Sequence, residues 1–233
     1  MHSLSHRKPA MQLVIGNKNY SSWSMRPWVL MKQLGIPFEE IKLRFDFSEG
    51  SAYRQTVARY TPARSVPVLV DDGFSIWDTV AITEYLAERH AAVWPANRQH
   101  RARARSLVAE MHAGFGALRN HCPMNIEAQL PDVGARVWAE ERKVQRDVAR
   151  IEGAFANALS SSGGPFLFGE FSAADAYFAP VCMRFLTYAL PVSDTTRGYV
   201  QRVVAAPGVA AWIADALAEK DYLDFEEPHR KHR

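Results

Sequence analysis

The sequence has few cysteines, no long apolar segment and no strong excess of charge. Its 233 residues include only two cysteines, Cys122 and Cys182, which are too few for a disulfide framework or a four-ligand zinc site. No apolar run approaches the ~18 residues that a transmembrane helix needs. The 28 basic and 25 acidic residues leave a net charge of +3, too little to indicate a nucleic-acid surface. The sequence therefore favours a soluble cytoplasmic protein with reduced cysteines and no membrane or nucleic-acid partner.

The composition is that of an ordinary globular protein. Hydrophobic residues make up 48% and charged residues 23% of the chain, which excludes a disordered or collagen-like protein. Residues 1–10 are polar and basic and lack the apolar stretch of a secretory signal. We expect them to form a disordered tail outside the fold.

Residues 11–90 have the patterns of a small α/β domain. Their order is strand, helix, strand, weak helix, a hairpin around Asp72-Gly73, and a helix that begins at Asp78. The next stretch, 91–100, is polar and contains a proline, and it predicts a linker.

The rest of the chain, 101–233, has helical patterns only. We expect two long helices, at 101–120 and 133–159, followed by three shorter ones. In the second long helix, apolar residues recur at intervals of 7, 4, 3, 4 and 4 from Val137 to Leu159, which is a strong amphipathic signal. The sequence thus predicts an all-α domain at 101–233 after the α/β domain.

Several serines stand where the first strand meets the first helix. Ser21, Ser22 and Trp23 precede Arg26 and Pro27 in this segment. A hydroxyl at a helix N-terminus lies beside free backbone N–H groups and the positive end of the helix dipole, where an anion such as a thiolate is stabilised. The alternative is that one serine only caps the helix.

Two residue pairs in the α/β domain are candidates for ligand binding. Pro67 lacks an N–H donor and must lie at a strand end or edge, and a cis Val66–Pro67 bond would turn the backbone of Val66 toward a cleft. Asp78 and Thr79 precede a helix. They fit either an ordinary N-cap or a site that binds the ammonium and carboxylate groups of a small ligand.

A further pair, Ser172 and Asp175, begins a helix in the second half. Its spacing is that of a capping box with Asp in place of Glu. We interpret these two residues as structural.

Together these motifs resemble the cytosolic glutathione transferase family, in particular its serine-type, zeta- and theta-like members. The family pattern Ser-Ser-x-Ser-x-Arg stands here at Ser21 to Arg26, and Val-Pro-x-Leu stands at Val66 to Leu69. An acid–hydroxyl pair followed by x-Ala-Ile-x-x-Tyr-Leu begins at Asp78, and Gly-x-x-Ser-x-Ala-Asp ends at Asp175. The resemblance extends from Met11 onward and implies a thioredoxin-like α/β domain followed by an all-helical domain.

The resemblance also implies glutathione as the co-substrate and assigns residues to it. Ser22 matches the catalytic serine of theta-like members and Ser21 the serine often named in zeta-like members; we expect Ser22 to stabilise the thiolate, with Ser21 as the alternative. The residues implied for glutathione are Val66 with a cis Pro67 for the cysteinyl backbone, Asp78 and Thr79 for the γ-glutamyl end, and Arg64 and Ser65 for the glycyl carboxylate. The positions expected near the second substrate are Trp23, Met111, His112 and Phe115.

The activity implied is attack of the glutathione thiolate on a small hydrophobic electrophile, in a homodimer without a metal. No cysteine lies within 20–27, which argues against thiol-reductase chemistry. Zeta-class isomerases carry a substrate-binding arginine about three residues beyond the position of Arg184, so the match to maleylacetoacetate isomerase is incomplete. A glutathione-dependent isomerase, peroxidase or dehalogenase remains an alternative, as does a non-catalytic binding module with this fold.

Overall fold

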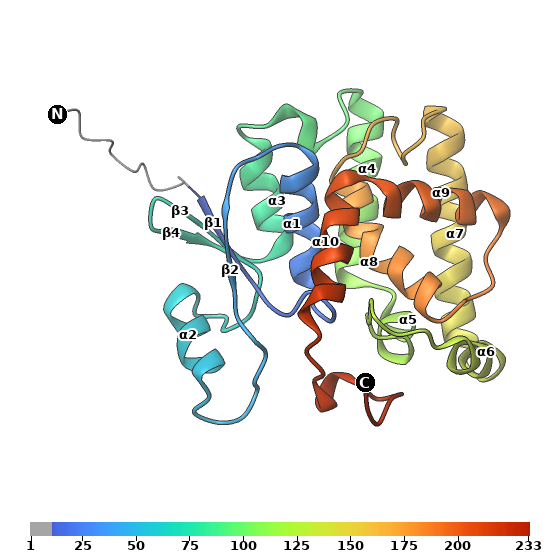
Figure 1. The fold of residues 1–233 in the computed structure, drawn as a ribbon. Coiled ribbons are helices and arrows are strands. Elements are labelled where there is room, and N and C mark those ends of the chain that lie inside the picture. The colour runs from blue at the N-terminus through green and yellow to red at the C-terminus, as the bar shows by residue number, and fades with distance from the viewer. Residues whose placement is uncertain (1–10) are drawn as a thin grey trace.

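The computed structural model describes residues 11–233, and the tail expected at 1–10 lies outside the described residues. Its first part contains four strands and three helices (Figure 1). They are β1 (Met11–Ile15), α1 (Ser22–Gln33), β2 (Glu39–Lys42), α2 (Ala52–Tyr60), β3 (Val68–Asp71), β4 (Phe74–Ile76) and α3 (Thr79–Ala87).

The strands form one mixed sheet in the order β2-β1-β3-β4. β1 is parallel to β2, and β3 is antiparallel to both β1 and β4. The hairpin expected at Asp72-Gly73 joins β3 to β4, and both turn residues have positive φ angles, 46° and 83°. Helices α1 and α3 lie between this sheet and the second part of the molecule (Figure 1).

The second part is helical. Its elements are η1 (Ala91–Val93), α4 (Arg98–Ala113), α5 (Gly116–His121), α6 (Pro131–Glu140), α7 (Arg142–Ser162), α8 (Ala173–Thr187), α9 (Asp194–Ala205), α10 (Pro207–Glu219) and η2 (Asp224–Glu226). The expected fold class, a thioredoxin-like domain followed by an all-helical domain, is confirmed. Among residues 11–233, no helix combines the length and apolar character needed to cross a bilayer.

The prediction of two long helices is wrong, because each expected helix is divided into two in the structure. The first ends at Ala113, and Phe115 has a φ of 56° before α5 begins. The second is interrupted at Glu141, whose N–H still bonds to the carbonyl oxygen of Val137. The interval of seven residues from Val137 to Val144 spans this break, so the apolar periodicity continues across it.

The turn between β1 and α1 joins the two parts of the molecule. Its residues Asn17 to Tyr20 are buried although their side chains are polar. The ammonium group of Lys18 lies 2.7 Å from a carboxylate oxygen of Glu40 and 2.5 Å from one of Asp215, which is in α10. The indole N–H of Trp212, also in α10, donates to the carbonyl oxygen of Lys18 (3.1 Å). This turn therefore connects the sheet to the last helix.

Helix α8 forms the centre of the helical part, and Asp175 lies in its first turn with no exposed surface. The carboxylate accepts hydrogen bonds from the backbone N–H groups of Ser172 (2.9 Å) and Leu167 (3.0 Å), and from the hydroxyl groups of Tyr199 (2.9 Å) and Ser172 (3.3 Å). Burial raises the pKa of Asp175 to about 6, and the hydrogen bonds oppose this rise. The Asp175 carboxylate therefore links α8 to α9 and to the loop that precedes α8.

Replacing this carboxylate should destabilise the fold. Asp175→Ala leaves at least three buried donors without an acceptor, at roughly 1–3 kcal/mol each, so the free energy of unfolding should fall by about 3–5 kcal/mol. The control is Asp194→Ala, because Asp194 lies in the first turn of α9 with a fully exposed side chain. It should cost less than ~1 kcal/mol. Urea unfolding measures both, and equal midpoints would contradict the structural role of Asp175.

Candidate active site

Ser21 is the N-cap of α1, and its hydroxyl group is fully engaged. It accepts a hydrogen bond from the Ser24 backbone N–H (3.3 Å) and donates to the Ser24 hydroxyl oxygen (2.7 Å). That oxygen in turn accepts from the backbone N–H of Gly16 at the end of β1 (3.1 Å). Ser21 is also buried. Its side chain therefore fixes the start of the helix.

Ser22 differs from its neighbour. It is partly exposed and is the first residue of α1. Within the described part of the chain, 11–233, its hydroxyl group makes no hydrogen bond. This hydroxyl is therefore available to donate to a ligand. Its place at the positive end of the helix dipole favours an anion as that ligand.

Both serines line a cavity of about 370 Å³ between the two parts of the molecule. The side formed by the α/β domain includes six of the residues expected from the sequence. These are Ser21, Ser22, Trp23, Arg64, Ser65 and Val66. The helical side contributes Arg119, Asn120, Pro123, Met124, Arg184 and Glu226. The structure thus brings together the serine motif and the segment before β3, which are about 40 residues apart in the sequence.

The Val66–Pro67 peptide bond is cis, as expected. Val66 is partly exposed toward the cavity, whereas Pro67 is buried behind it at the start of β3. Arg64 and Ser65 are exposed at the cavity wall. Val66 is therefore placed to present its backbone groups to a ligand.

Asp78 and Thr79 lie beside the cavity and do not line it. Asp78 caps α3 by accepting from the Val80 N–H (3.2 Å), and its side chain is half exposed. Thr79 is fully buried. The imidazole ring of His112 lies between the two side chains, with Nε2 3.3 Å from Asp78 Oδ2 and Nδ1 3.3 Å from Thr79 Oγ1. The ring of His112 also packs edge-on against Trp23, with centroids 5.1 Å apart.

Comparison with protein families decides what this arrangement belongs to. A model described as "Glutathione S-transferase, N-terminal domain" matches residues 20–89, and one described as "Glutathione S-transferase, C-terminal domain" matches residues 98–215. The chain belongs to the glutathione S-transferase family. The resemblance seen in the motifs is confirmed at this level.

Individual proteins agree with the family. The transferase chain is 27% identical to rat maleylacetoacetate isomerase over 162 residues, which is 68% of this chain and 70% of that protein. It is 34% identical to mouse glutathione S-transferase theta-3 over 99 residues, 41% of this chain and 39% of that one. A solved glutathione transferase homolog from Burkholderia gl BGR1, with bound glutathione, superposes with a TM-score of 0.67 at 26% identity, covering 88% of this chain and 97% of that chain.

Met111 and Phe115, expected near the second substrate, are buried in the hydrophobic core of the transferase and do not line the cavity. His112 does not line the cavity, but it contacts two residues that do: its ring packs against Trp23, and its carbonyl oxygen accepts from Arg119. Of the residues expected near that substrate, Trp23 alone lies in the cavity wall.

Two arginines in the cavity wall were not among the expected site residues, although Arg184 was compared with the substrate-binding arginine of zeta-class isomerases. Arg119 donates to the carbonyl oxygens of Gly114 (3.2 Å) and His112 (3.4 Å). Arg184 is buried in α8 and donates to the carbonyl oxygens of Cys122 (2.9 Å) and Pro180 (3.2 Å). A charged residue among the apolar residues of α8 was a signal that could have placed Arg184 in the site. No comparable signal marks Arg119.

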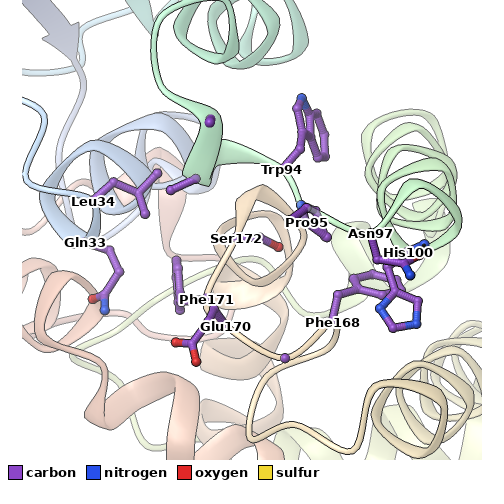
Figure 2. A pocket seen from close by; sticks show the side chains of 14 residues that line it. Gln33, Leu34, Trp94, Pro95, Asn97, His100, Phe168, Glu170, Phe171 and Ser172 are labelled. Carbon is purple, nitrogen blue, oxygen red and sulfur yellow. Dashed lines mark hydrogen bonds between the residues drawn. The ribbon is translucent and has the colours of Figure 1, made fainter.

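A larger cavity, of about 730 Å³, lies at the other end of α1 (Figure 2). Figure 2 shows Gln33 and Leu34 on one side of it and Asn97, His100 and Phe168 on the other. A helix of the length of α1 spans roughly 16–18 Å, so this cavity is remote from Ser22. None of the residues expected to hold glutathione lines it. The site residues expected from the sequence therefore gather at the smaller cavity.

The two serines should affect stability differently. Ser21→Ala removes the N-cap of α1 and the bond to Ser24, so it should lower the free energy of unfolding by about 1–2 kcal/mol. Ser22→Ala removes no hydrogen bond within the described residues and should change stability by less than ~0.5 kcal/mol. Urea unfolding of both variants tests this difference. A larger loss in Ser22→Ala than in Ser21→Ala would show that the cap is assigned to the wrong serine.

Proposed function

We propose that the protein is a glutathione transferase in which the Ser22 hydroxyl group stabilises the glutathione thiolate for attack on a small hydrophobic electrophile. The observation that carries this proposal is the pairing of the two serines. Ser21 is occupied as a helix cap, while Ser22 has a free hydroxyl group in the wall of a cavity. A solved relative supports glutathione as the ligand, since the Burkholderia homolog holds bound glutathione.

The energy needed for thiolate formation is within reach of this site. An ordinary thiol has a pKa of about 8.5, so only a few per cent is thiolate at neutral pH. Lowering that pKa by ~2 units requires about 2.7 kcal/mol of differential stabilisation. A hydrogen bond to a charged acceptor contributes about 1.5–3 kcal/mol, and the helix N-terminus adds up to ~2 kcal/mol. One serine at the start of α1 is therefore sufficient.

Glutathione would lie along the α/β side of the cavity. Val66 would bind the cysteinyl backbone through its own backbone N–H and C=O groups, while Arg64 and Ser65 face the glycyl carboxylate. Asp78 would accept the γ-glutamyl ammonium group, since its carboxylate is half exposed. Thr79 is buried, and its hydroxyl group contacts the same His112 that contacts Asp78. In this placement Thr79 supports Asp78 through His112.

The electrophile would occupy the helical side, where Met124 and Pro123 form an apolar wall. A glutathione-dependent isomerase is the second candidate, because rat maleylacetoacetate isomerase is among the relatives. Both reactions begin with the same thiolate, so a panel of electrophiles that includes maleylacetoacetate separates them.

The proposal also retains the cytoplasmic homodimer expected from the sequence. Both cysteines are unpaired and buried in this chain, as that location requires.

Glutathione should bind and stabilise the fold by mass action. At one hundred times its dissociation constant, it should add about 2.7 kcal/mol to the free energy of unfolding. Asp78→Asn should weaken glutathione binding by roughly ten-fold or more, because it removes the charge facing the ammonium group. The control is Asp72→Asn in the exposed turn between β3 and β4. Calorimetry and thermal unfolding at millimolar glutathione measure both effects, and their absence in the unmodified protein would favour the non-catalytic binding module.

Ser22→Ala should shift the pH dependence of turnover. The pKa of the bound glutathione thiol should rise by ~1–2 units, corresponding to one lost hydrogen bond to a charged acceptor. Turnover near neutral pH should then fall roughly 10- to 100-fold and recover partly at alkaline pH, where the thiolate forms unaided. The measurement is a pH–rate profile with any accepted electrophile.

Ser21→Ala is the matched control for this experiment, because Ser21 is adjacent but engaged with Ser24. It should lose stability without an alkaline shift of the profile. An alkaline shift in Ser21→Ala alone would reverse the roles of the two serines. If neither profile shifts, the thiolate is stabilised by other groups and the assignment of Ser22 is wrong.

A further inference from the structure

A small hydrophobic cluster, separate from the main core, forms part of the wall of the smaller cavity. Its buried members are Tyr20, Phe45, Tyr53, Val57 and Leu223. Tyr20, Phe45 and Tyr53 also line the cavity. Val66, whose backbone is proposed to bind glutathione, packs against the same cluster. The cluster therefore supports the part of the wall where glutathione would lie.

Helix α2 and the loop that joins it to β2 depend on this cluster for their packing. In Figure 1, α2 lies at one end of the sheet, away from α1 and α3. The buried residues of α2 are Tyr53 and Val57, and both belong to the cluster. Phe45, in the loop, packs edge-on against Tyr53 with ring centroids 5.5 Å apart. A segment that buries so few apolar side chains opens more readily than the main core does.

The segment that follows α10, residues 221–227, contacts both the cluster and the loop. Leu223 is 2% exposed within the cluster, and its N–H donates to the phenol oxygen of Tyr20 (3.4 Å). The ring of Phe225 packs against that of Phe47, which lies in the loop and lines the cavity, with centroids 5.2 Å apart. Residues from the end of the chain thus complete the packing of a wall that is built near its start.

The same segment is fixed to other parts of the molecule. The Glu227 carboxylate is buried and accepts hydrogen bonds from the phenol of Tyr20 (2.6 Å) and from the side-chain amide of Asn125 (2.8 Å) in the helical part. The Asp221 carboxylate accepts two hydrogen bonds, both 2.9 Å, from the guanidinium group of Arg44 in the loop before α2. The match to the C-terminal family model ends at residue 215, so these contacts lie outside the matched family pattern.

We propose that residues 221–227 hold α2 and the loop before it in the conformation that binds glutathione, so that Leu223 and Phe225 set the affinity for this co-substrate. The inference rests on the proposed transferase function. Neither residue lines the cavity, so both act as positioning residues, through the cluster and through Phe47. A site that is formed for only a fraction of the time binds its ligand more weakly by that fraction. Contacts that keep the wall formed therefore raise the affinity without touching the ligand.

Leu223→Ala should weaken glutathione binding and leave the later steps unchanged. If the wall is then formed about one tenth of the time, the dissociation constant and the KM for glutathione rise roughly ten-fold. Bound glutathione restores the wall, so kcat at saturating glutathione and the KM for the electrophile should stay within about two-fold. Leu223→Met keeps an apolar side chain of similar volume and should restore the affinity. Calorimetry with glutathione and steady-state kinetics with any accepted electrophile measure these quantities.

Phe225→Ala tests the same contact without removing a buried side chain. Phe225 is 54% exposed, so its replacement should not prevent folding. The lost contact with Phe47 should raise the dissociation constant for glutathione roughly two- to ten-fold. The matched control is Leu217→Ala, which removes another exposed apolar side chain from the neighbouring α10 and should leave the affinity unchanged.

The matched control for Leu223→Ala is Leu167→Ala. Leu167 is fully buried in the main core, and the loop before α8 that contains it does not line the smaller cavity. Its replacement should lower the midpoint of urea unfolding and leave the affinity for glutathione unchanged. The pair therefore separates a loss of general stability from a loss of the wall.

Hydrogen exchange measured without glutathione reports on the wall directly. The backbone amides of α2 should exchange faster in Leu223→Ala than in the unmodified protein, whereas those of α8 should not change. Saturating glutathione should slow the exchange of α2 again, because it binds the formed wall.

Three results would overturn the proposal. An unchanged dissociation constant in folded Leu223→Ala and Phe225→Ala would show that the segment does not act on glutathione binding. A higher KM for the electrophile alone would show that the segment serves the second substrate. Equal acceleration of exchange in α2 and α8 would show that Leu223 contributes only to general stability.

Failure of the transferase function gives a different pattern. In that case the unmodified protein turns over no electrophile and gives no heat of binding with glutathione, and the link to glutathione falls with the proposed function. The exchange measurement then decides alone whether the segment holds α2. Faster exchange confined to α2 in Leu223→Ala supports that role, and unchanged exchange in α2 overturns it.

Discussion

The buried polar turn from Asn17 to Tyr20 is the contact on which the rest of the structure depends. It follows the central β-strand and leads into α1, so its position decides where the cavity forms. Each residue of the turn bonds to a group from the helical part or the C-terminal segment. The partners are Asp221 for Asn17, Asp215 for Lys18, Asn125 for Asn19, and Glu227 for Tyr20, whose phenol donates to the Glu227 carboxylate at 2.6 Å. Losing these partners would leave several buried polar groups unpaired, which is the costliest defect in a folded chain.

The different environments of Ser21 and Ser22 follow from the fixed position of this turn. Because the turn is fixed, Ser21 can cap α1 while the next residue faces the cavity with an uncommitted hydroxyl group. The cavity lies between two domains of different character. The α/β side presents backbone groups and hydroxyls that suit a peptide ligand, and the helical side presents arginines and apolar side chains. In the proposed function, the α/β half would bind glutathione and the helical half would set the choice of the second substrate.

Local chemistry in the sequence predicted the parts of this architecture that depend on neighbouring residues. The hairpin at Asp72-Gly73, the order of strands and helices along residues 11–90 and the serine motif all follow from local sequence or from a short motif. The breaks near Phe115 and Glu141 were not predictable, since a single non-helical residue does not change the apolar period. The contacts of Arg119 and His112 were not predictable either. Each depends on which groups from distant elements surround it, and the sequence of one chain does not show that.

The sequence separation of the turn's contacts has a consequence for synthesis of the chain. Trp212 and Glu227, which complete the turn, follow it by 194 and 207 residues. A ribosome that adds about 5–20 residues per second reaches them roughly 10–40 s after the turn has been made. During that time water must hydrate the polar groups that are later buried. The segment that carries Ser22 is thus made long before the groups that fix its final geometry.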